Sequence, residues 1–454
     1  MHTYDAILIG TGQAAYTLVS GLLAQGQTVA VIEGDDRFGG TCANYGCTPT
    51  KALVASARAM WGAREAARWG VSVGEVTLDF AAVMARMNGI RGAEGLGHYL
   101  MEHAAVYHGF AQFEDANTVR IGSDVIRGQR IYIHVGTRPR RPTIPGADSV
   151  TILDNRSLLE LTALPEHLII LGGSYIGMEY AQIFRRFGSA VTVIEPSPTL
   201  MSREDADISQ ILRDLMEGEG VTILCGAVPQ SVAPVVGGGV ALTVARGGET
   251  LTVSGSHLFS AIGRIPNSDT LNLAAAGVIA DARGFITVNE HLQTNIPHIY
   301  ALGDVNGRGA FTHTSVNDGE IVLDNLKGGD RGVSDRIMTY SLFTDPPLAR
   351  VGIGEREARQ SGKRVLMGTR PMSKIGRARE KGETVGMVKL LVDADTDLFL
   401  GATVFGVGGD EVVNMITVCM TAGITAKQFR KTVLIHPTVA ELIPWVLDDL
   451  QPLT

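Results

Sequence analysis

The chain has 454 residues, of which 45% are hydrophobic and 19% are charged, with a formal net charge of −8. This length exceeds what one hydrophobic core supports, so we expect two to four domains. The charge lacks long blocks of one sign, which argues against nucleic acid or an anionic membrane as a partner. No signal peptide or membrane-spanning stretch is recognisable and four cysteines cannot form a secreted disulfide framework, so we expect a cytoplasmic protein.

Residues 4–33 form the first of two strand–glycine turn–helix–strand patterns. An apolar strand leads into the turn Gly10 to Ala15, which contains Gly12, and the second strand ends in Glu33. This is the layout of a dinucleotide-binding βαβ unit, in which the terminal acid follows the turn by about 20 residues. Ala15 stands where the third glycine is usual, and its small side chain is tolerated there.

Residues 167–195 repeat the pattern with Gly172, Ser174 and Gly177 in the turn and Glu195 at the end. Ser174 replaces the second glycine, so the approach of a pyrophosphate to the backbone is more crowded. The alternative is a pair of ordinary crossovers whose glycines only allow close packing. Two complete units favour two dinucleotide sites.

The remaining chain falls into segments of recognisable periodicity. We expect helices over residues 48–106, strands over 117–136, a crossover at 139–146, a hairpin at 240–255, and antiparallel strands from about Ile337 followed by helices near 409–422 and 438–450. The last part contains no nucleotide motif and indicates a separate α+β domain.

The sharpest local feature is the pair Cys42 and Cys47. Thr48 as N-cap and Pro49 as first helical residue predict a helix that begins just after Cys47. Five residues of regular helix would separate the two Cα atoms by about 7.5 Å, beyond the roughly 7 Å limit for an unstrained disulfide. The pair must therefore lie in a distorted segment leading into the helix, which Gly46 permits. A helix amino terminus stabilises a thiolate, so we expect a lowered pKa for Cys47.

Reduced structural cysteines, or half of a zinc site, are the alternatives for this pair. The other cysteines, Cys225 and Cys419, have no paired spacing and lie in apolar surroundings, as buried thiols would. We therefore expect a redox-active pair and no bound metal.

The segment GGTCANYGCTPTK at residues 39–51 resembles the active-site signature of the class I pyridine nucleotide–disulfide oxidoreductases. That family includes glutathione reductase, lipoamide dehydrogenase and mercuric reductase. The resemblance covers essentially the whole chain and includes ALGD at 301–304 and HPTVAE at 436–441. The phrases GTGQAA, FTDPPLARVG and PMSKIGRA are most similar to the mercuric-reductase-like group, which includes the copper reductases of the reactive-chlorine response.

The resemblance implies an α/β fold with two Rossmann-like domains, for FAD and NAD(P), and a carboxyl-terminal α+β dimerisation domain. The implied division is an FAD-binding part at 1–148, an NAD(P)-binding domain at 149–269, a return segment of the FAD-binding domain at 270–336 and the dimerisation domain at 337–454. It also implies a homodimer whose active site is shared between subunits.

The implied cofactor contacts follow the two turns. On the FAD side they are Gly10, Gly12, Ala15, Glu33 at the adenosine ribose, Gly40, Thr41, Lys51 and Asp304 at the ribityl chain. On the NAD(P)H side they are Gly172, Ser174, Tyr175 as a gate for nicotinamide, Gly177, Glu195 and Gly263. A carboxylate such as Glu195 accepts a hydrogen bond from a ribose 2′-hydroxyl and repels a 2′-phosphate, which favours NADH. NADPH stays an alternative, because Arg203 lies nearby in the sequence and a loop arginine can turn towards a 2′-phosphate.

The resemblance makes Cys42 the interchange thiol that meets substrate and Cys47 the charge-transfer thiolate against the flavin. Lys51 would lie near the reactive flavin nitrogen, paired with Glu179. Taken alone, that pair could be any ion pair on a helix surface.

His436, oriented by Glu441, would be the acid/base of the other subunit's cysteine pair. Histidine suits proton transfer near neutral pH, and a carboxylate fixes its tautomer. Taken alone, His436 could be a packed loop histidine and Glu441 a first-turn partner of the helix dipole.

Together these features predict an NAD(P)H-dependent FAD enzyme that reduces a disulfide or a thiol-reactive metal ion. No cysteine follows Cys419, where mercuric reductases carry a second pair, so efficient Hg(II) reduction is not expected. Dihydrolipoamide dehydrogenase is the runner-up. A redox-inactive flavoprotein acting as a binding or sensing module is a further alternative, against which the intact Cys42, Cys47 and His436 argue.

Overall fold

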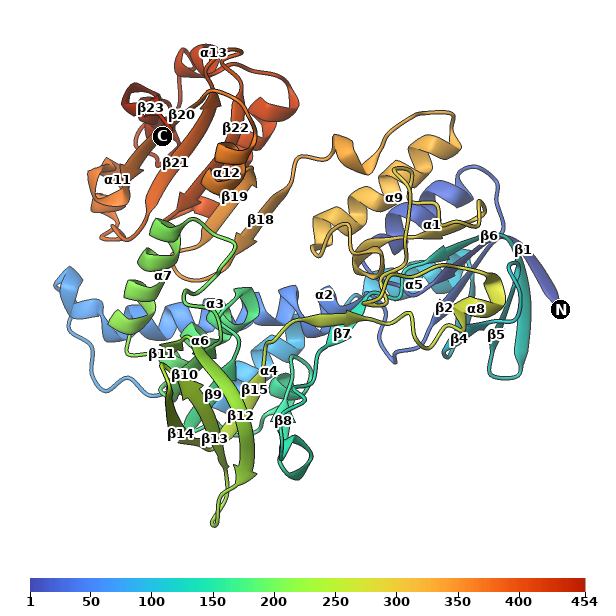
Figure 1. The fold of residues 1–454 in the computed structure, drawn as a ribbon, viewed down its shortest axis with the longest axis horizontal. Coiled ribbons are helices and arrows are strands. Elements are labelled where there is room, and N and C mark those ends of the chain that lie inside the picture. Colours follow the sequence, from blue (N-terminus) through green and yellow to red (C-terminus); the bar gives the residue numbers. More distant parts are fainter. Residues whose placement is uncertain (454) are drawn as a thin grey trace.

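The computed structural model describes residues 1–453, and its elements gather in three lobes (Figure 1). The first glycine pattern and the yellow segment that follows the hairpin lie in the right-hand lobe, the second pattern lies in the lower lobe, and the carboxyl-terminal part forms the upper left lobe. The helix α3 (Cys47–Arg64) starts at the right-hand lobe and runs along the top of the lower lobe.

The right-hand lobe is built on a seven-stranded sheet in the order β3-β2-β1-β6-β5-β4, with β17 paired to β6. Its strands are β1 (His2–Ile9), β2 (Val29–Glu33), β3 (Ala105–His108), β4 (Ala111–Phe113), β5 (Thr118–Ile121), β6 (Asp124–Ile133) and β17 (Ile299–Ala301). Every residue of β2 is buried, as expected for a parallel strand covered on both faces. The helix α1 (Ala15–Leu23) packs beside α9 (Thr312–Leu326), so the return segment completes the lobe.

The lower lobe holds a parallel five-stranded sheet in the order β11-β10-β9-β15-β8 and a three-stranded antiparallel sheet. The parallel strands are β8 (Ile152–Leu153), β9 (His167–Leu171), β10 (Ala190–Glu195), β11 (Thr222–Cys225) and β15 (His257–Ser260). The helices are α6 (Tyr175–Phe187) and α7 (Ala206–Gly218), and the antiparallel strands are β12 (Ala227–Pro234), β13 (Val240–Arg246) and β14 (Glu249–Gly255).

The upper left lobe holds a six-stranded antiparallel sheet in the order β18-β19-β22-β21-β20-β23. Its strands are β18 (Thr339–Leu342), β19 (Leu348–Gly352), β20 (Val365–Pro371), β21 (Met387–Asp393), β22 (Phe399–Phe405) and β23 (Gln451–Pro452), and its helices are α10 (Glu355–Gln360), α11 (Gly376–Glu380), α12 (Gly409–Thr421), α13 (Ala426–Arg430) and α14 (Ile443–Val446). Two Rossmann-like sheets and an α+β lobe are the fold class predicted from the sequence.

The helical prediction for residues 48–106 is wrong in part. Helices α3, α4 (Phe80–Ile90) and α5 (Glu94–His103) are present, but residues 71–79 are irregular and β3 begins at Ala105. Gly70 has a left-handed backbone (φ 73), and the β-branched residues after it favour extended conformations. The helix expected near 438–450 is reduced to α14 between single 3₁₀ turns, because Pro444 cannot donate to the preceding turn.

The lower lobe, the upper left lobe and α3 meet at Arg186, a residue of α6 that is only 3% exposed. Its guanidinium lies 2.7 Å from a carboxylate oxygen of Glu219 and 2.6 Å from one of Asp345, which precedes β19. The same group lies 5.0 Å from the ring centre of Trp61 on α3. This buried pairing fixes how α3, α6 and the upper left lobe sit together. Within residues 1–453, no helix combines the length and apolar character needed to cross a membrane.

Candidate active site

The cysteine pair lies where two helices meet. Cys42 belongs to α2 (Gly40–Tyr45), Cys47 is the first residue of α3, and Gly46 separates the helices with φ −134° and ψ −110°. The distortion expected between the cysteines is therefore present. The predicted helix start, with Thr48 as N-cap, was late by two residues, since Gly46 is the N-cap and its carbonyl already accepts the Thr50 N–H at 3.0 Å.

The two cysteines are not joined by a disulfide, and the hydroxyl of one threonine lies next to both sulfurs. Thr312, the first residue of α9, has its Oγ1 2.9 Å from Cys42 Sγ and 3.5 Å from Cys47 Sγ. The sequence argument missed Thr312, because it lies 265 residues from Cys47 and no local pattern marks it.

The two thiols have opposite acidities. A hydrogen bond from the Cys42 thiol, together with the Thr312 hydroxyl and the charge of Lys51, outweighs burial and lowers the pKa of Cys47 to about 6. The same hydrogen bond and burial raise the pKa of Cys42. The pair therefore carries its negative charge on Cys47 and its proton on Cys42.

Lys51 lies one helical turn beyond Cys47 and meets Glu179 of α6. Its Nζ is 2.7 and 2.8 Å from the two carboxylate oxygens. Glu179 also accepts the backbone N–H of Phe343 at 2.9 Å, and the ammonium lies 4.6 Å from the centre of the Phe343 ring. The aromatic face and the carboxylate together hold the cation in place. Phe343 is a second contact that the sequence argument missed.

The first glycine turn is braced by the acid at the end of its own unit. Glu33 accepts the backbone N–H of Thr11 at 3.0 Å and its hydroxyl, while its other oxygen accepts the N–H of Asp35 at 2.8 Å. Gly10 has φ +97°, which only glycine adopts readily. A Cβ on Gly40, beside Thr41 at the start of α2, would lie 3.0 Å from the Gly12 Cα. The backbones of Gly12 and Gly40 are therefore close, and α1 begins at Ala15, three residues after Gly12.

The return segment brings Asp304 to the same lobe. Its Oδ2 accepts the Thr137 hydroxyl at 3.0 Å, at the junction of β6 with the crossover. Asp304 therefore lies beside the sheet that carries the first turn, although more than 250 residues separate them.

The second turn repeats the bracing. Glu195 accepts the N–H of Gly173 at 2.7 Å through one oxygen and that of Ser197 at 2.7 Å through the other. Gly172 has φ +105°, and a Cβ on Gly177 would lie 2.0 Å from its carbonyl oxygen, so both must be glycine. Ser174 is the N-cap of α6 without a side-chain cap bond, and Gly263 (φ +103°) faces open space.

Tyr175, the expected gate, packs edge-on against Phe311 and Tyr340, at centroid distances of 6.1 and 5.7 Å. Its hydroxyl lies 3.4 Å from the buried carboxylate of Glu204, to which Tyr340 donates at 2.7 Å. Burial and the nearby Glu204 charge raise the pKa of Tyr175, so it is a neutral phenol. Phe311 directly precedes Thr312, so this aromatic group adjoins the thiols along the chain.

His436 and Glu441 form a pair on the upper left lobe. The imidazole Nδ1 lies 2.9 and 3.0 Å from the two carboxylate oxygens. The His436 side chain is 81% exposed and, within residues 1–453, forms no hydrogen bond or ion pair with either cysteine of its own chain. Its Nε2 is thus free to meet another molecule.

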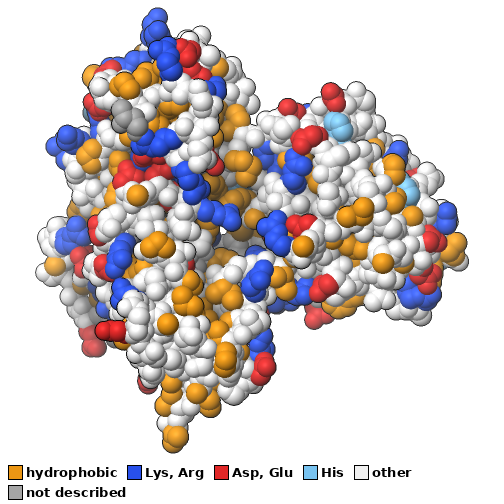
Figure 2. All heavy atoms as spheres, in the orientation of Figure 1, with side chains coloured by type: hydrophobic (Ala, Val, Ile, Leu, Met, Phe, Trp, Pro, Cys, Tyr) orange, Lys and Arg blue, Asp and Glu red, His pale blue; other side chains and the backbone are white. Residues whose placement is uncertain are grey.

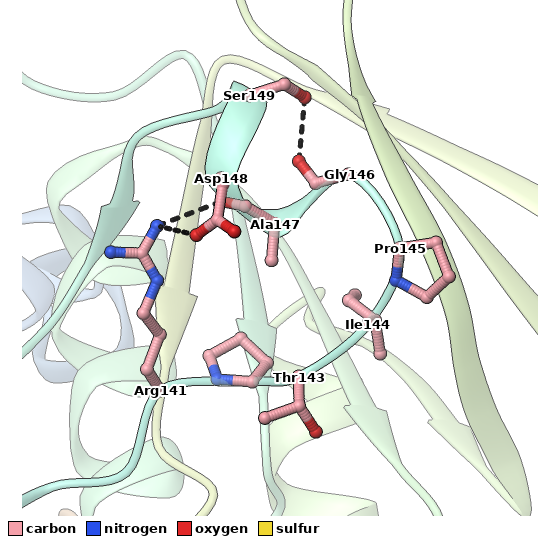
Figure 3. A pocket seen from close by; sticks show the side chains of 9 residues that line it. Arg141, Thr143, Ile144, Pro145, Gly146, Ala147, Asp148 and Ser149 are labelled. Carbon is pink, nitrogen blue, oxygen red and sulfur yellow. Dashed lines mark hydrogen bonds and ion pairs between the residues drawn. The ribbon is translucent and has the colours of Figure 1, made fainter.

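The visible face of the molecule is hollowed between the lobes, and Lys and Arg side chains gather around the hollow (Figure 2). A separate hollow is lined by residues 141–149 of the crossover alone (Figure 3). In it Arg141 pairs with Asp148 at 3.2 Å, and no predicted site residue lines it. The candidate active site therefore consists of the cysteine pair and the two glycine turns, and the hollow at residues 141–149 is not part of it.

Comparison with known proteins agrees with this geometry. Residues 4–319 match the pyridine nucleotide-disulphide oxidoreductase family, and residues 338–447 match its dimerisation domain. The chain belongs to the pyridine nucleotide-disulphide oxidoreductase family. It is 34% identical to the probable pyridine nucleotide-disulfide oxidoreductase RclA of Escherichia coli, covering 97% of this chain and 98% of that one. It is also 34% identical to a mercuric reductase of Streptomyces lividans, covering 97% and 95%.

Solved structures extend the likeness to three dimensions. A copper(II) complex of the HOCl-induced flavoprotein disulfide reductase RclA from Escherichia coli superimposes with a TM-score of 0.88 at 33% identity, covering 99% of each chain. A pyridine nucleotide-disulphide oxidoreductase is an enzyme that uses FAD and NAD(P)H, and the dimerisation domain makes this member a homodimer. These findings confirm the family, the fold class and the enzyme class predicted from the sequence.

Proposed function

We propose that this enzyme passes electrons from NAD(P)H through FAD to a Cys42–Cys47 disulfide and on to a disulfide or thiol-reactive metal substrate. The observation that carries the proposal is the pair of adjacent thiols with opposite acidity beside one hydroxyl. One sulfur is a stable thiolate and the other keeps a proton, which is the division needed when one thiol serves the flavin and the other the substrate.

The first turn fits FAD. A left-handed glycine, the amino terminus of α1 and the Glu33 carboxylate are the parts a dinucleotide site requires. Gly10, Gly12, Ala15 and Glu33 would hold the adenosine and pyrophosphate, with Gly40, Thr41, Lys51 and Asp304 along the rest of the cofactor. Bound FAD supplies two-electron transfer between the nicotinamide and the cysteine disulfide.

The chain's own residues account for the proton and sulfur steps. Nε2 of His436 takes the proton of the Cys42 thiol, and the Cys42 thiolate attacks one sulfur of a disulfide substrate. The other substrate sulfur leaves as a thiolate and takes that proton from the His436 imidazolium. Cys47 then attacks Cys42, which restores the Cys42–Cys47 disulfide and releases the second substrate thiolate. Glu441 holds Nδ1 and supports the imidazolium. The exposure of His436 supports the supply of this group by the other subunit of the homodimer.

Glu195 supports a preference for NADH. Its oxygens keep lone pairs for a ribose 2′-hydroxyl beyond the two backbone bonds, and its charge opposes a 2′-phosphate. The neutral, loosely held Tyr175 beside this turn is suited to move aside for the nicotinamide. Gly172, Ser174, Gly177 and Gly263 would form the remaining contacts.

The acceptor is proposed as a disulfide or a metal ion that binds thiols. The copper(II) complex of the RclA relative makes Cu(II) the first metal to test. Lipoamide is the second candidate acceptor, because the chain is 29% identical to the dihydrolipoyl dehydrogenase of Geobacillus stearothermophilus over 96% of its length.

The test is anaerobic addition of NADH to the FAD-loaded protein. We expect a long-wavelength thiolate–flavin absorbance that is lost in Cys47→Ser and retained in Cys225→Ser, a matched change at a buried thiol. NADH oxidation is then compared with Cu(II), lipoamide, oxidised glutathione and Hg(II). A folded, FAD-replete protein without the absorbance would indicate the redox-inactive module instead. Turnover unchanged by Cys42→Ser would exclude the dithiol route.

A further inference from the structure

The first glycine turn rests on a buried histidine. His134 directly follows β6 and is 6% exposed. Its Nδ1 lies 3.0 Å from the Leu302 carbonyl oxygen, and its Nε2 lies 3.3 Å from the Ala14 backbone nitrogen and 3.4 Å from Ser315 Oγ. One imidazole therefore joins the turn after β1, the segment after β17 and the helix α9.

These partners fix the position of the imidazole proton. A backbone carbonyl can only accept and an amide N–H can only donate. Nδ1 therefore carries the proton, and Nε2 accepts from Ala14. Ala14 is the N-cap of α1, which has no side-chain cap. His134 therefore supplies an acceptor for the N–H of the N-cap residue, where no side chain of the helix does so.

The same ring fills the space next to Gly12. A Cβ at Gly12 would lie 2.5 Å from His134 Nε2, 3.1 Å from Cδ2 and 3.2 Å from Cε1, and these are its three nearest atoms. Gly12 is not among the residues with positive φ, so its backbone would accept alanine. The ring is held on its other side, because Nδ1 is bonded to the Leu302 carbonyl oxygen and the Gly303 backbone lies so near that an added Cβ there would be 2.8 Å from Cε1.

We propose that His134 is a positioning residue for the pyrophosphate of FAD, and that its imidazole is what requires glycine at position 12. The inference rests on the proposed function in one respect, that FAD occupies the first turn. In such motifs the second glycine is generally explained by close approach of the backbone to the pyrophosphate. In this chain, the atom nearest to a Cβ built at position 12 is Nε2 of the protein's own His134, 2.5 Å away.

The test is a double-mutant cycle on FAD affinity. Flavin-free wild type, Gly12→Ala, His134→Ala and the double variant are titrated with FAD, and binding is read from the quenching of flavin fluorescence. We expect each single variant to bind FAD about tenfold more weakly or worse, because the turn is displaced or its helix cap is lost. We expect the double variant to bind no more weakly than His134→Ala, because the clash is gone.

Two outcomes overturn the proposal. If Gly12→Ala weakens FAD binding by the same factor with and without the histidine, the pyrophosphate excludes the side chain and the imidazole does not. If His134→Ala binds FAD as the wild type does, the histidine positions nothing.

Controls separate positioning from general stability. His134→Gln keeps an acceptor for the Ala14 N–H and should recover part of the affinity lost in His134→Ala. Gly21→Ala, on the same helix, would place a Cβ 2.4 Å from the Leu323 side chain. It should lower the thermal midpoint of the flavin-free protein and leave FAD affinity within about twofold of wild type. Loss of the proposed function would instead show in the wild type, as absence of the NADH-induced absorbance.

Discussion

At the scale of single residues, a hydrogen bond between two neighbouring thiols gives them opposite acidities, and one hydroxyl lies beside both. Thr312 lies within hydrogen-bonding reach of both sulfurs, and with Lys51 it favours negative charge beside them. Because one sulfur donates to the other, the pKa of Cys47 falls to about 6 while that of Cys42 rises. Near neutral pH the pair holds one proton and one charge.

A pH titration tests this division. The pKa of Cys47 is lowered, so its thiolate is present above pH 6 and is lost as the pH falls through that value. The long-wavelength absorbance of the anaerobically reduced enzyme should therefore rise with a midpoint near pH 6. Thr312→Val removes a hydroxyl donor with little change in volume. It should raise the midpoint by roughly one pH unit, the equivalent of about 1.4 kcal/mol.

Thr314→Val is the matched control, because this threonine is on the same helix but donates to the Phe311 carbonyl at 2.7 Å. An equal midpoint in wild type and Thr312→Val would show that the hydroxyl does not stabilise the thiolate.

The residue-scale predictions succeeded where the information is local. The rise of a helix was enough to require a distortion between Cys42 and Cys47, and Gly46 provides it. Thr312 and His134 could not be found in this way. Their partners lie more than 100 positions away, and neither residue type stands out at the end of a strand or the start of a helix.

At the scale of elements, the two glycine units share the same hydrogen-bonding arrangement around their terminal acid. Glu33 and Glu195 each accept an N–H from their own turn and another from the residue two positions beyond the acid. The acid that would meet a ribose therefore also holds the turn in shape. This double role explains why strand, turn and acid recur together and could be recognised from the sequence.

Helices were predictable where a glycine turn and an acid-ended strand enclose them. Helices α1 and α6 lie inside the predicted patterns at residues 4–33 and 167–195. The irregular stretch 71–79 was not predicted, because apolar residues at helical spacing surround it on both sides. Which helices face one another, as α3 and α6 do at Lys51 and Glu179, depends on packing that no single segment encodes.

The ion pairs of Arg186 predict a large stability effect at the junction of α6 with β19. Asp345→Asn removes one of two buried counter-charges, and Glu219→Gln removes the other. Each change leaves the buried guanidinium with a single counter-charge and weakens one charge-assisted hydrogen bond, so each should lower the free energy of unfolding by about 1.5–3 kcal/mol in a urea titration.

Glu217→Gln serves as the comparison, because its pair with Arg213 on α7 is largely exposed. It should cost less than about 1 kcal/mol. Equal losses in the buried and exposed variants would show that the junction contributes no more than a surface contact.

At the scale of the whole molecule, His436 stands on an exposed segment of the dimerisation domain. Val433 and Ile435 beside it are also largely exposed. Within one chain these side chains lack a covering surface, as expected for a face that a second subunit meets. The resemblance to the family predicted the homodimer. A single sequence, however, gives no distance between His436 and the cysteine pair of either subunit.

Mixed dimers test whether the site is shared. Cys42→Ser and His436→Ala should each be inactive as homodimers. If the histidine serves the partner's cysteines, a heterodimer of the two variants restores one intact site and should recover about half the wild-type turnover per dimer. Tagged subunits purified as heterodimers and assayed with NADH give the measurement. Inactive heterodimers would place each histidine with the cysteines of its own chain.

The pairing of β17 with β6 affects how the protein is made. During translation, the carboxyl end of β6 leaves the ribosome with β1 on one side and no neighbour on the other until residues 299–301 have been added. The entire lower lobe is synthesised in that interval and can fold first. Leu302 and Asp304 also emerge only then. Because Asp304 is a proposed contact of FAD, we expect the nascent chain to retain FAD only after about two thirds of it has been synthesised.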